Sequence, residues 1–204
     1  MEKKYKLFKF LQESGYFSRR SAIKAIKYGL VKVNKKIIKE PWFEVSLDDK
    51  ISFKGFEIKL NAPTRYVIYY KPENSTYFPK ELRYLIPLEN LPKVDEGLII
   101  LTNDKDLHKA YNRKFVKNKY VAELSVPLEN FKYKNVRLFP ISREKVIITT
   151  IKLKVGKLKE IIPKIKKLKR IEIESIVLPR ELKPGNYRDM TEDEILALKR
   201  VLLN

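Results

Sequence analysis

Apolar side chains recur every three or four positions over residues 5–13, which predicts a short amphipathic helix at the start of the chain. A second helix is expected to follow at once, because Ser18 is a suitable N-cap and Gly29 stands where a left-handed residue would end it. Apolar and polar residues then alternate over 30–37 around a polar turn, as in a small β-hairpin. The first sixty or so residues therefore predict a compact unit of two helices and a few strands.

The pattern changes after residues 61–64, Asn-Ala-Pro-Thr, which have the composition of a linker. Beyond it, runs of β-branched and aromatic residues predict strands, and helical spacing predicts helices. The expected strands cover 65–70, 98–101, 119–126, 146–155 and 170–178, and the expected helices cover 106–113, 161–168 and 191–202, the last opened by a capping box from Thr191 to Glu194. We expect an α+β protein with a small ααβ domain at 1–61, followed at 65–204 by a domain with a mixed, mainly antiparallel sheet and flanking helices.

The charge of the chain is strongly one-sided. Its 204 residues include 45 Lys and Arg against 25 Asp and Glu, a formal net charge of +20. An excess of one sign does not stabilise a fold, so it predicts a polyanionic partner. The basic residues are spread over expected strands, loops and helices, whereas a membrane surface would require a basic amphipathic helix with bulky apolar residues opposite. The charge therefore favours nucleic acid, and the alternative is a thermophilic composition rich in Lys, Ile and Glu.

Several classes of protein are disfavoured by what the sequence lacks. It has no cysteine, which rules out disulfides, thiolate metal sites and a cysteine nucleophile. Because His108 is the single histidine, a histidine-based metal site is not expected either. The start of the chain does not resemble a secretory signal, and no apolar run is long enough to span a bilayer. We expect a cytoplasmic monomer without metal, cofactor or membrane partner.

Three segments of the first unit carry a specific resemblance. Leu7-Phe-Lys-Phe-Leu11, Gly15-Tyr-Phe-Ser-Arg-Arg-Ser-Ala22 and Gly29-Leu-Val-Lys-Val-Asn-Lys-Lys36 are similar to the S-four-type RNA-binding domain, a small module named after a ribosomal protein. In that family the second helix and the hairpin face the RNA. The resemblance implies contacts, mostly to phosphates of a structured RNA, from Ser18, Arg19, Arg20, Lys24, Lys27, Lys32, Asn34, Lys35 and Lys36.

The second region resembles the pseudouridine synthases that act on ribosomal RNA, which carry the same RNA-binding domain in front. The matching segments are Tyr66-Val-Ile-Tyr-Tyr-Lys-Pro72, Gly97-Leu-Ile-Ile-Leu-Thr-Asn-Asp104, Leu168-Lys-Arg-Ile171 and Lys183-Pro-Gly-Asn-Tyr-Arg-Asp-Met-Thr191. The resemblance implies the pseudouridine synthase fold and an isomerisation that detaches, rotates and rejoins the uridine base through carbon. It also implies ribosomal RNA, or a ribosomal subunit precursor, as the partner.

One loop of the second region departs from the family's catalytic motif. The family carries its essential Asp in Gly-Arg-Leu-Asp-x-x-Ser/Thr-x-Gly-Leu-Leu, but a gapless comparison puts Glu89, Asn90 and Pro92 at the Gly, Arg and Asp positions. A second register pairs Lys93-Val-Asp95 with Arg-Leu-Asp and shortens the connection to the strand by three residues, up to ~10 Å of extended chain. Asp95 is then either the catalytic carboxylate, with Lys93 as its cation, or a loop carboxylate that is solvated or forms a salt bridge with a neighbouring Lys for little gain. We favour the second interpretation.

Two further positions bear on activity. The family has a Gln-Val/Ile-Arg-Arg-Met segment that places a basic residue against the catalytic Asp, and here Ile162 and Pro163 stand where the two arginines are expected. Tyr120 matches the family tyrosine whose ring stacks on the target base, although a core tyrosine at the edge of a sheet is an equal alternative. The basic run in this region extends the expected RNA-binding surface if helical spacing puts it on one face, and from it we single out Lys157, Lys159 and Lys164.

The sequence leaves three functions open. The first is an RNA-binding protein on a pseudouridine synthase scaffold whose catalysis is impaired or lost. The second is an active synthase that isomerises uridine in ribosomal RNA with Asp95 as its carboxylate. The third is a ribosome-assembly factor that binds ribosomal RNA without chemistry.

Overall fold

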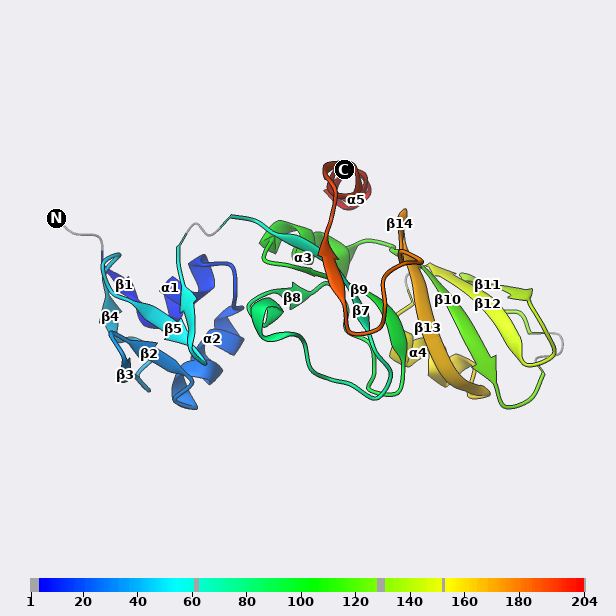
Figure 1. Cartoon of the computed structure of the whole chain (residues 1–204), viewed down its shortest axis with the longest axis horizontal. Helices are drawn as coiled ribbons and strands as arrows, with labels where there is room; N and C mark the ends of the chain where they lie inside the picture. Colours follow the sequence, from blue (N-terminus) through cyan, green and yellow to red (C-terminus); the bar gives the residue numbers. More distant parts are fainter. Residues whose placement is uncertain (1–3, 61–62, 128–130, 152, 204) are drawn as a thin grey trace. The chain divides into compact units, whose positions relative to one another are not determined.

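The computed structural model describes residues 4–60, 63–127, 131–151 and 153–203 (Figure 1). The chain divides into two compact units. Unit 1 runs to Thr64 and includes the short segment Tyr84–Ile86, and unit 2 comprises Arg65–Arg83 and the chain from Pro87 onward. Within the described ranges, no helix is long and apolar enough to cross a membrane.

The segment Tyr84–Ile86 belongs to unit 1 although the sequence pattern assigned it to the second domain. The ring of Tyr84 stacks on Phe56 with the centroids 4.7 Å apart, and it meets Tyr16 edge-on at 5.3 Å. Aromatic pairs in these geometries are stabilising beyond the area that they bury. The chain therefore returns to unit 1 for three residues, which a boundary drawn from composition cannot detect.

Unit 1 combines two helices with short antiparallel strands. Its elements are β1 (Tyr5–Lys6), α1 (Leu7–Glu13), α2 (Arg19–Lys27), β2 (Val31–Val33), β3 (Lys36–Ile37), β4 (Glu44–Val45), β5 (Ile51–Phe53) and β6 (Phe56–Ile58). Strands β3, β2, β5 and β6 form one sheet in that order, and β1 pairs with β4. The predicted cap of the second helix is confirmed, because the Ser18 hydroxyl accepts a hydrogen bond from the Ser21 amide. Gly29 follows the helix with a φ of +69°.

The turn between β2 and β3 is rigid. Asn34 and Lys35 both have left-handed backbone conformations, with φ values of 48° and 71°. Two consecutive residues of this kind make the turn that matches the twist of a hairpin. The Asn34 amide donates to Asp49 at 2.5 Å and accepts from the Lys50 backbone amide at 2.9 Å. The basic side chains of this hairpin therefore project from a fixed backbone.

Unit 2 is built around one large sheet. Its elements are β7 (Tyr66–Lys71), the 3-10 helix η1 (Lys80–Leu82), β8 (Ile86–Pro87), β9 (Glu96–Thr102), α3 (Lys105–Arg113), β10 (Lys117–Leu124), β11 (Val136–Pro140), β12 (Lys145–Ile151), α4 (Val155–Ile161), β13 (Ile165–Ile173), β14 (Ile176–Val177), β15 (Tyr187–Asp189) and α5 (Glu192–Leu203). The strand order is β11-β12-β10-β13-β9-β7-β15, with β14 on β13 and β8 on β9. The β13–β9 pair is parallel and the other pairs along this order are antiparallel. The expected α+β class with a mainly antiparallel sheet is confirmed.

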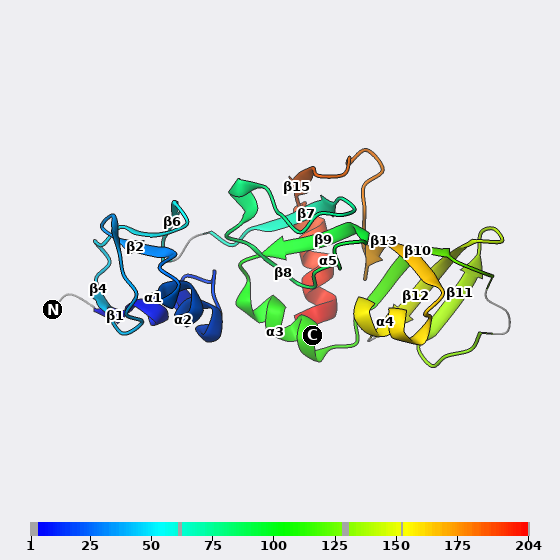
Figure 2. The same ribbon diagram turned by 90° about the horizontal axis from the view of Figure 1, so that it is seen from below.

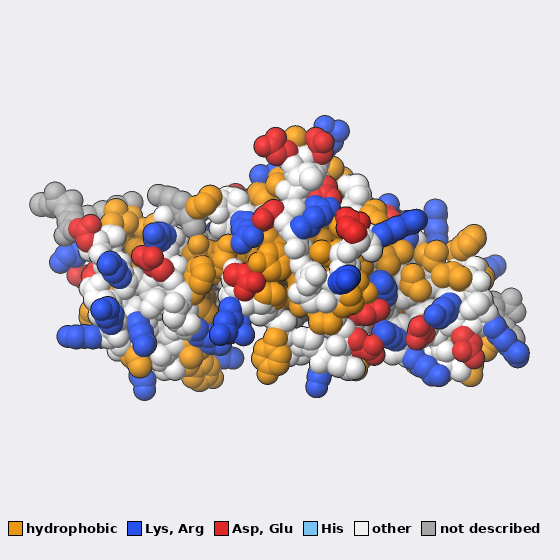
Figure 3. Space-filling model, viewed as in Figure 1, with side chains coloured by type: hydrophobic (Ala, Val, Ile, Leu, Met, Phe, Trp, Pro, Cys, Tyr) orange, Lys and Arg blue, Asp and Glu red, His pale blue; other side chains and the backbone are white. Residues whose placement is uncertain are grey.

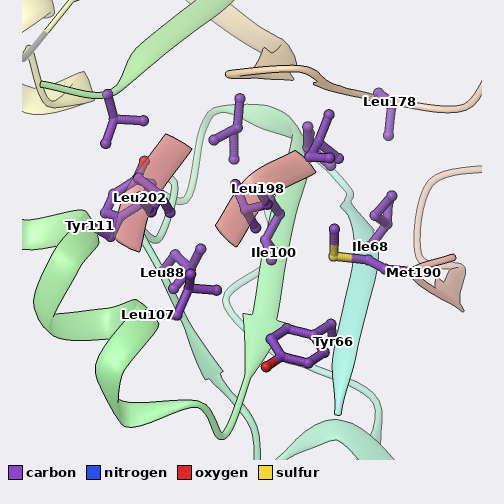
Figure 4. Close-up of a cluster of buried hydrophobic side chains, with 14 of the residues drawn as sticks. Tyr66, Ile68, Leu88, Ile100, Leu107, Tyr111, Leu178, Met190, Leu198 and Leu202 are labelled. Carbon is purple, nitrogen blue, oxygen red and sulfur yellow. The ribbon is translucent and has the colours of Figure 1, made fainter. Parts of the chain in front are cut away.

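A cluster of apolar side chains joins α3 and α5 to β7 and β9 (Figure 4). It includes Tyr66, Ile68, Leu88, Ile100, Leu107, Tyr111, Leu178, Met190, Leu198 and Leu202. Both helices begin with side-chain caps, which satisfy amides that lack partners within the helix. Asp104 accepts from the amides of Asp106 and Leu107, and Thr191 and Glu194 form the predicted capping box.

The basic segment that follows β12 folds differently from its prediction. The helix expected at 161–168 is wrong, because α4 ends at Ile161 and Ile165 already begins β13. Pro163 explains why α4 ends, because helical backbone is disfavoured for the residue that precedes a proline. That residue, Ile162, has φ −121° and ψ 77° and lies outside the helix. The basic run is therefore divided between α4 and β13 (Figure 2) and does not form one helical face.

Strands β9 and β13 approach most closely at a glycine. Gly97 has a φ of +114°, and a Cβ built on it would overlap the backbone of Arg170, with the amide nitrogen only 2.6 Å away. Real Cβ atoms essentially never come this close to another heavy atom. The parallel pairing of the two strands therefore requires glycine at this position.

We expect Gly97→Ala to lower the free energy of unfolding by about 3–5 kcal/mol, because the added methyl meets backbone that cannot move aside and φ is unfavourable as well. Gly185→Ala is the matched control, since Gly185 has a φ of +89° but open space around its Cβ position, and we expect it to cost about 1–2 kcal/mol. Urea unfolding followed by circular dichroism measures both. Equal losses in the two variants would show that position 97 requires glycine because of its backbone conformation and not because β9 and β13 approach closely there.

Candidate functional site

Two buried cations hold the loop between β8 and β9 onto the sheet, and the first is Lys71. It lies at the end of β7 with 2% of its surface exposed. Its ammonium donates hydrogen bonds to the backbone carbonyls of Pro72 and Lys93, both at 3.1 Å, and of Asp95 at 2.5 Å. Burial lowers the pKa of Lys71, and nearby carboxylates oppose that effect. All three protons of the ammonium are used, so the C-terminal part of the loop is fixed.

The second cation, Arg170 on β13, fixes the start of the loop. Its side chain is completely buried. Nε donates to the Leu98 carbonyl at 2.7 Å, while the two terminal nitrogens donate to the Glu89 carboxylate at 2.9 Å and the Glu89 carbonyl at 2.8 Å. Glu89 is thus bound through both its side chain and its backbone. A planar guanidinium is suited to several fixed acceptors at once.

Asp95 is not solvated, so that form of the favoured interpretation is wrong, although the carboxylate does form a salt bridge with a Lys, as the other form expected. It is completely buried, and its Oδ1 accepts from Lys159 Nζ at 2.7 Å and from the Leu168 amide at 3.0 Å. The cation beside it is Lys159 on α4, whereas the proposed partner Lys93 is exposed. A basic residue therefore lies against this carboxylate even though the family's two arginines are missing.

Two buried tyrosines complete the site. Tyr120 on β10 is completely buried, as expected for a tyrosine of the core rather than one whose ring is open to stack on a base. Tyr111 at the end of α3 is 6% exposed. The Tyr111 hydroxyl donates to the Glu89 carboxylate at 3.1 Å. Burial raises the pKa of both phenols far above the ordinary value, with Arg170 opposing the shift and Glu89 adding to it. Both hydroxyls therefore stay protonated and can donate hydrogen bonds at any physiological pH.

Several buried polar atoms of unit 2 lack a hydrogen-bond partner. Among the described residues, the buried side-chain atoms without a hydrogen bond of good geometry are Asp95 Oδ2, Asn118 Oδ1, the Tyr120 hydroxyl and Thr150 Oγ1. Asn118 and Tyr120 share one face of β10, with Thr150 directly opposite Asn118 and Arg170 opposite Tyr120. Buried polar groups are normally paired, so such a concentration is expected where water or a ligand binds.

A small cavity opens beside Glu89. Its volume is about 190 Å³, and it is lined by Glu89, Tyr111, Asn112, Arg113, Lys114, Val116, Asn118, Leu153 and Lys154. The walls come from the loop before β9, the end of α3, the start of β10 and the segment before α4. Asp95, Lys93 and Tyr120 are not among the lining residues.

The residues that we expected to bind RNA in unit 1 lie at its surface. All nine are exposed: Ser18, Arg19, Arg20, Lys24, Lys27, Lys32, Asn34, Lys35 and Lys36. Two of the nine have structural roles, since Ser18 caps α2 and Asn34 fixes the hairpin turn. The space-filling view shows many Lys and Arg side chains on the visible face of unit 1 and relatively few acidic ones (Figure 3).

The three basic residues singled out in unit 2 are separated by the structure. Lys157 is exposed and pairs with Glu160 at 2.8 Å, and Lys164 is exposed at the junction of α4 and β13. Lys159 instead turns inward to Asp95, with 24% of its side chain exposed. The expectation that Lys159 belongs to an open RNA-binding surface is therefore wrong, because its charge is used by a buried carboxylate.

Several residues of this site were missed by sequence reasoning. In the sequence, Glu89 stands out only as a replacement for a glycine, and Arg170 only as a member of the matching segment Leu168–Ile171. Lys71, Tyr111 and Asn118 were not singled out. Arg170 and Lys71 do lie in segments that match the family, which was an available signal. Nothing local to Glu89 shows that a guanidinium 81 residues further along the chain will bind it.

Comparison with known proteins covers both units. An S4 domain matches residues 6–51. An uncharacterised RNA pseudouridine synthase of Rickettsia bellii is 30% identical over 92% of this chain and 97% of its own. The ribosomal small subunit pseudouridine synthase A of Vibrio vulnificus is 27% identical over 93% of this chain and 97% of its own. The ribosomal large subunit pseudouridine synthase B of Bacillus subtilis is 30% identical over 58% of this chain and 55% of its own.

A solved structure shares the fold. A pseudouridylate synthase crystal structure superposes with a TM-score of 0.59, covering 94% of this chain and 98% of its own, at 24% sequence identity. The expected pseudouridine synthase fold is thereby confirmed for nearly the whole chain.

Replacing Arg170 should test how far the buried ion pair supports the site. We expect Arg170→Met to lower the free energy of unfolding by about 3–5 kcal/mol, because it leaves the Glu89 carboxylate buried without its cation. The double variant Glu89→Leu/Arg170→Met should recover part of that loss, since no charge remains unpaired. Lys157→Met, which breaks an exposed pair, is the control and should have no measurable effect. Thermal and urea unfolding measure all three, and a loss no larger for Arg170→Met than for Lys157→Met would contradict this role.

Proposed function

The chain belongs to the RNA pseudouridine synthase family and carries an S4 domain at its N-terminus, and from this premise we propose that it binds structured ribosomal RNA but that its own synthase activity is lost or strongly impaired. The observation that carries this proposal is the sequence of the loop between β8 and β9, where the family has its catalytic motif. Pro92 stands where the family's Asp is expected, and a proline has no side-chain group that could act as base or nucleophile.

The burial of Asp95 supports the same proposal. A carboxylate that acts on a flipped nucleotide must contact it, whereas Asp95 is completely buried and its Oδ1 is already held by Lys159 and the Leu168 amide. Lys71 also fixes the carbonyls of Lys93 and Asp95. Exposing Asp95 would require the loop to break several buried hydrogen bonds at once.

Ribosomal RNA is the proposed partner because charge and family agree on it. The net charge of +20 and the exposed basic residues of α2 and the β2–β3 hairpin suit phosphate contacts. The Vibrio vulnificus relative is named as a synthase of the small ribosomal subunit and the Bacillus subtilis relative as one of the large subunit, so both subunits are candidates. A protein of this kind works in the cytoplasm as a monomer and occupies its RNA site during or after subunit assembly. Cosedimentation with a subunit or its precursor, lost as salt increases, is the expected behaviour.

An active synthase is the second candidate, and one observation favours it. Asp95 Oδ2 has no hydrogen-bond partner, and Lys159 Nζ lies 2.7 Å from Oδ1 of the same carboxylate. If RNA binding displaced α4 or the loop, this oxygen would become available for chemistry. Because an active synthase would require this rearrangement, it is the less favoured of the two candidate functions.

Tritium release from ribosomal RNA labelled at uridine C5 separates these candidates. We expect the wild-type chain to release no more tritium than a sample without protein, because no carboxylate stands at the catalytic position. An active family member that has Asp at that position serves as the positive control. Release by the wild type that disappears in Asp95→Asn would overturn the proposal and establish the second candidate.

RNA binding should depend on those cations of α2 and β2 that form no ion pair with any residue the structure describes. We expect the triple variant Lys24→Gln/Lys27→Gln/Lys32→Gln to weaken binding to ribosomal RNA and to reduce the slope of log K against log[salt] by about 2–3, since each phosphate contact contributes roughly 0.7–0.9. The control Lys6→Gln/Lys9→Gln/Lys59→Gln removes three charges that already pair with Glu44, Glu13 and Glu57, and it should retain the slope. Filter binding across a salt series gives both slopes, and equal losses in the two variants would contradict a specific basic surface.

A further inference from the structure

The loop between β3 and β4 carries the single tryptophan of the chain, Trp42. This residue is 52% exposed. Tryptophan is highly buried in most proteins, because its ring removes a large apolar area from water. A single exposed apolar residue does not by itself mark a binding site. Trp42 is distinguished by the way in which its backbone and its ring are held.

The backbone on both sides of Trp42 is bound to the start of α1. The Leu7 amide donates to the Phe43 carbonyl at 2.8 Å, and the Phe8 amide donates to the Pro41 carbonyl at 3.0 Å. Amides in the first turn of a helix have no partner within it, and α1 has no side-chain cap. The loop takes the place of that cap, so Trp42 lies between two carbonyls that are fixed.

The ring of Trp42 is linked through a second aromatic ring to a cation. It meets the Phe8 ring edge-on, with the centroids 6.1 Å apart and the planes at 61°. The guanidinium carbon of Arg19 lies over the same Phe8 ring, 5.4 Å from its centroid. Arg19 is exposed, and it forms no ion pair with any residue that the structure describes. An exposed aromatic ring and an available cation therefore contact one shared neighbour.

The chemistry of these side chains suits an unpaired nucleotide. The face of an indole ring has no charge to hold a phosphate, but it can stack on any base. The Glu40 carboxylate accepts from the Trp42 backbone amide at 3.1 Å, and its charge makes a phosphate at this point of the loop less favourable still. Arg19 can bind the phosphate that joins the nucleotide to the next one. Ring and guanidinium thus match the two parts of one single-stranded nucleotide.

We propose that Trp42 stacks on one unpaired base of the bound RNA while Arg19 contacts the adjoining phosphate. This contact differs in kind from the phosphate contacts expected of α2 and the β2–β3 hairpin. It accepts any base, because every base has a face that can stack. The proposal rests on the proposed RNA-binding function and adds to it that the RNA in contact with unit 1 is single-stranded at one point.

Tryptophan fluorescence tests the contact directly, because Trp42 is the single tryptophan of the chain. The full chain is titrated with three RNAs: a hairpin with a short single-stranded tail, the same hairpin with a tail whose nucleotides lack bases, and the hairpin without a tail. Filter binding measures how tightly each one binds. We expect the first RNA to quench most of the tryptophan emission, since a stacked base contacts the ring, and the other two to bind while leaving the emission nearly unchanged.

Substitutions of Trp42 separate stacking from other contacts. Trp42→Ala should weaken binding of the tailed hairpin by about 5- to 150-fold, the loss expected for one base–aromatic stack, and Trp42→Phe should retain most of the affinity. Trp42→Leu keeps an apolar side chain without an aromatic face, and it should bind as weakly as Trp42→Ala. These variants remove no charge, so the slope of log K against log[salt] should stay as in the wild type. Arg19→Gln should instead reduce that slope by about 0.7–0.9.

The outcomes separate this contact from the proposed function. A tailed hairpin that binds without changing the emission of Trp42 would overturn the stacking and leave RNA binding in place. Equal quenching by the hairpin whose tail lacks bases would also overturn it, because the ring would then contact sugar or phosphate. So would a Trp42→Leu protein that binds the tailed hairpin as tightly as the wild type. Failure to bind any hairpin or ribosomal RNA would overturn the proposed function and the stacking with it.

Discussion

The buried contact between Arg170 and Glu89 is the interaction on which the rest of unit 2's site depends. A guanidinium without solvent access is tolerable only if its hydrogen bonds are made, and here they go to the Glu89 carboxylate, the Glu89 carbonyl and the Leu98 carbonyl. These acceptors belong to the loop and to the strand that follows it. The ion pair therefore determines where the loop starts relative to the sheet, and Lys71 determines where it ends.

The strand pairing of the sheet is what brings Arg170 to that loop. β9 and β13 are far apart in sequence, and they can lie parallel and in contact only because Gly97 has no side chain. The neighbouring strand β10 then places Tyr120 opposite Arg170 and Asn118 two residues away on the same face. One close backbone approach thus brings together a cation, two phenols and an amide from three separate stretches of the chain, α3, β10 and β13.

The two carboxylates of the loop differ in environment, and this difference carries the functional argument. Asp95 is enclosed with Lys159 against it, so it contributes to the packing of α4 on the sheet. Glu89 keeps one oxygen toward a small cavity with basic residues at its mouth. A scaffold with proline at the family's catalytic position and its neighbouring carboxylates buried is consistent with the proposed RNA-binding role. Recognition and chemistry are separable because phosphate and base contacts do not require a reactive group.

The elements that could be predicted from the sequence are those whose causes are local. The Ser18 cap, the hairpin turn at Asn34 and the Thr191–Glu194 capping box follow from neighbouring residues, and the unit 1 basic surface follows from charge and spacing. The roles of the charged side chains in unit 2, in contrast, depend on contacts between distant parts of the chain. Asp95 and Lys159 were expected to be solvated, because nothing local shows that these residues, 64 positions apart, pair with each other. In the same way, Glu89 is bound by Arg170, which lies on a strand 81 residues further along the chain. Long-range strand pairing, which no local pattern encodes, set those distances.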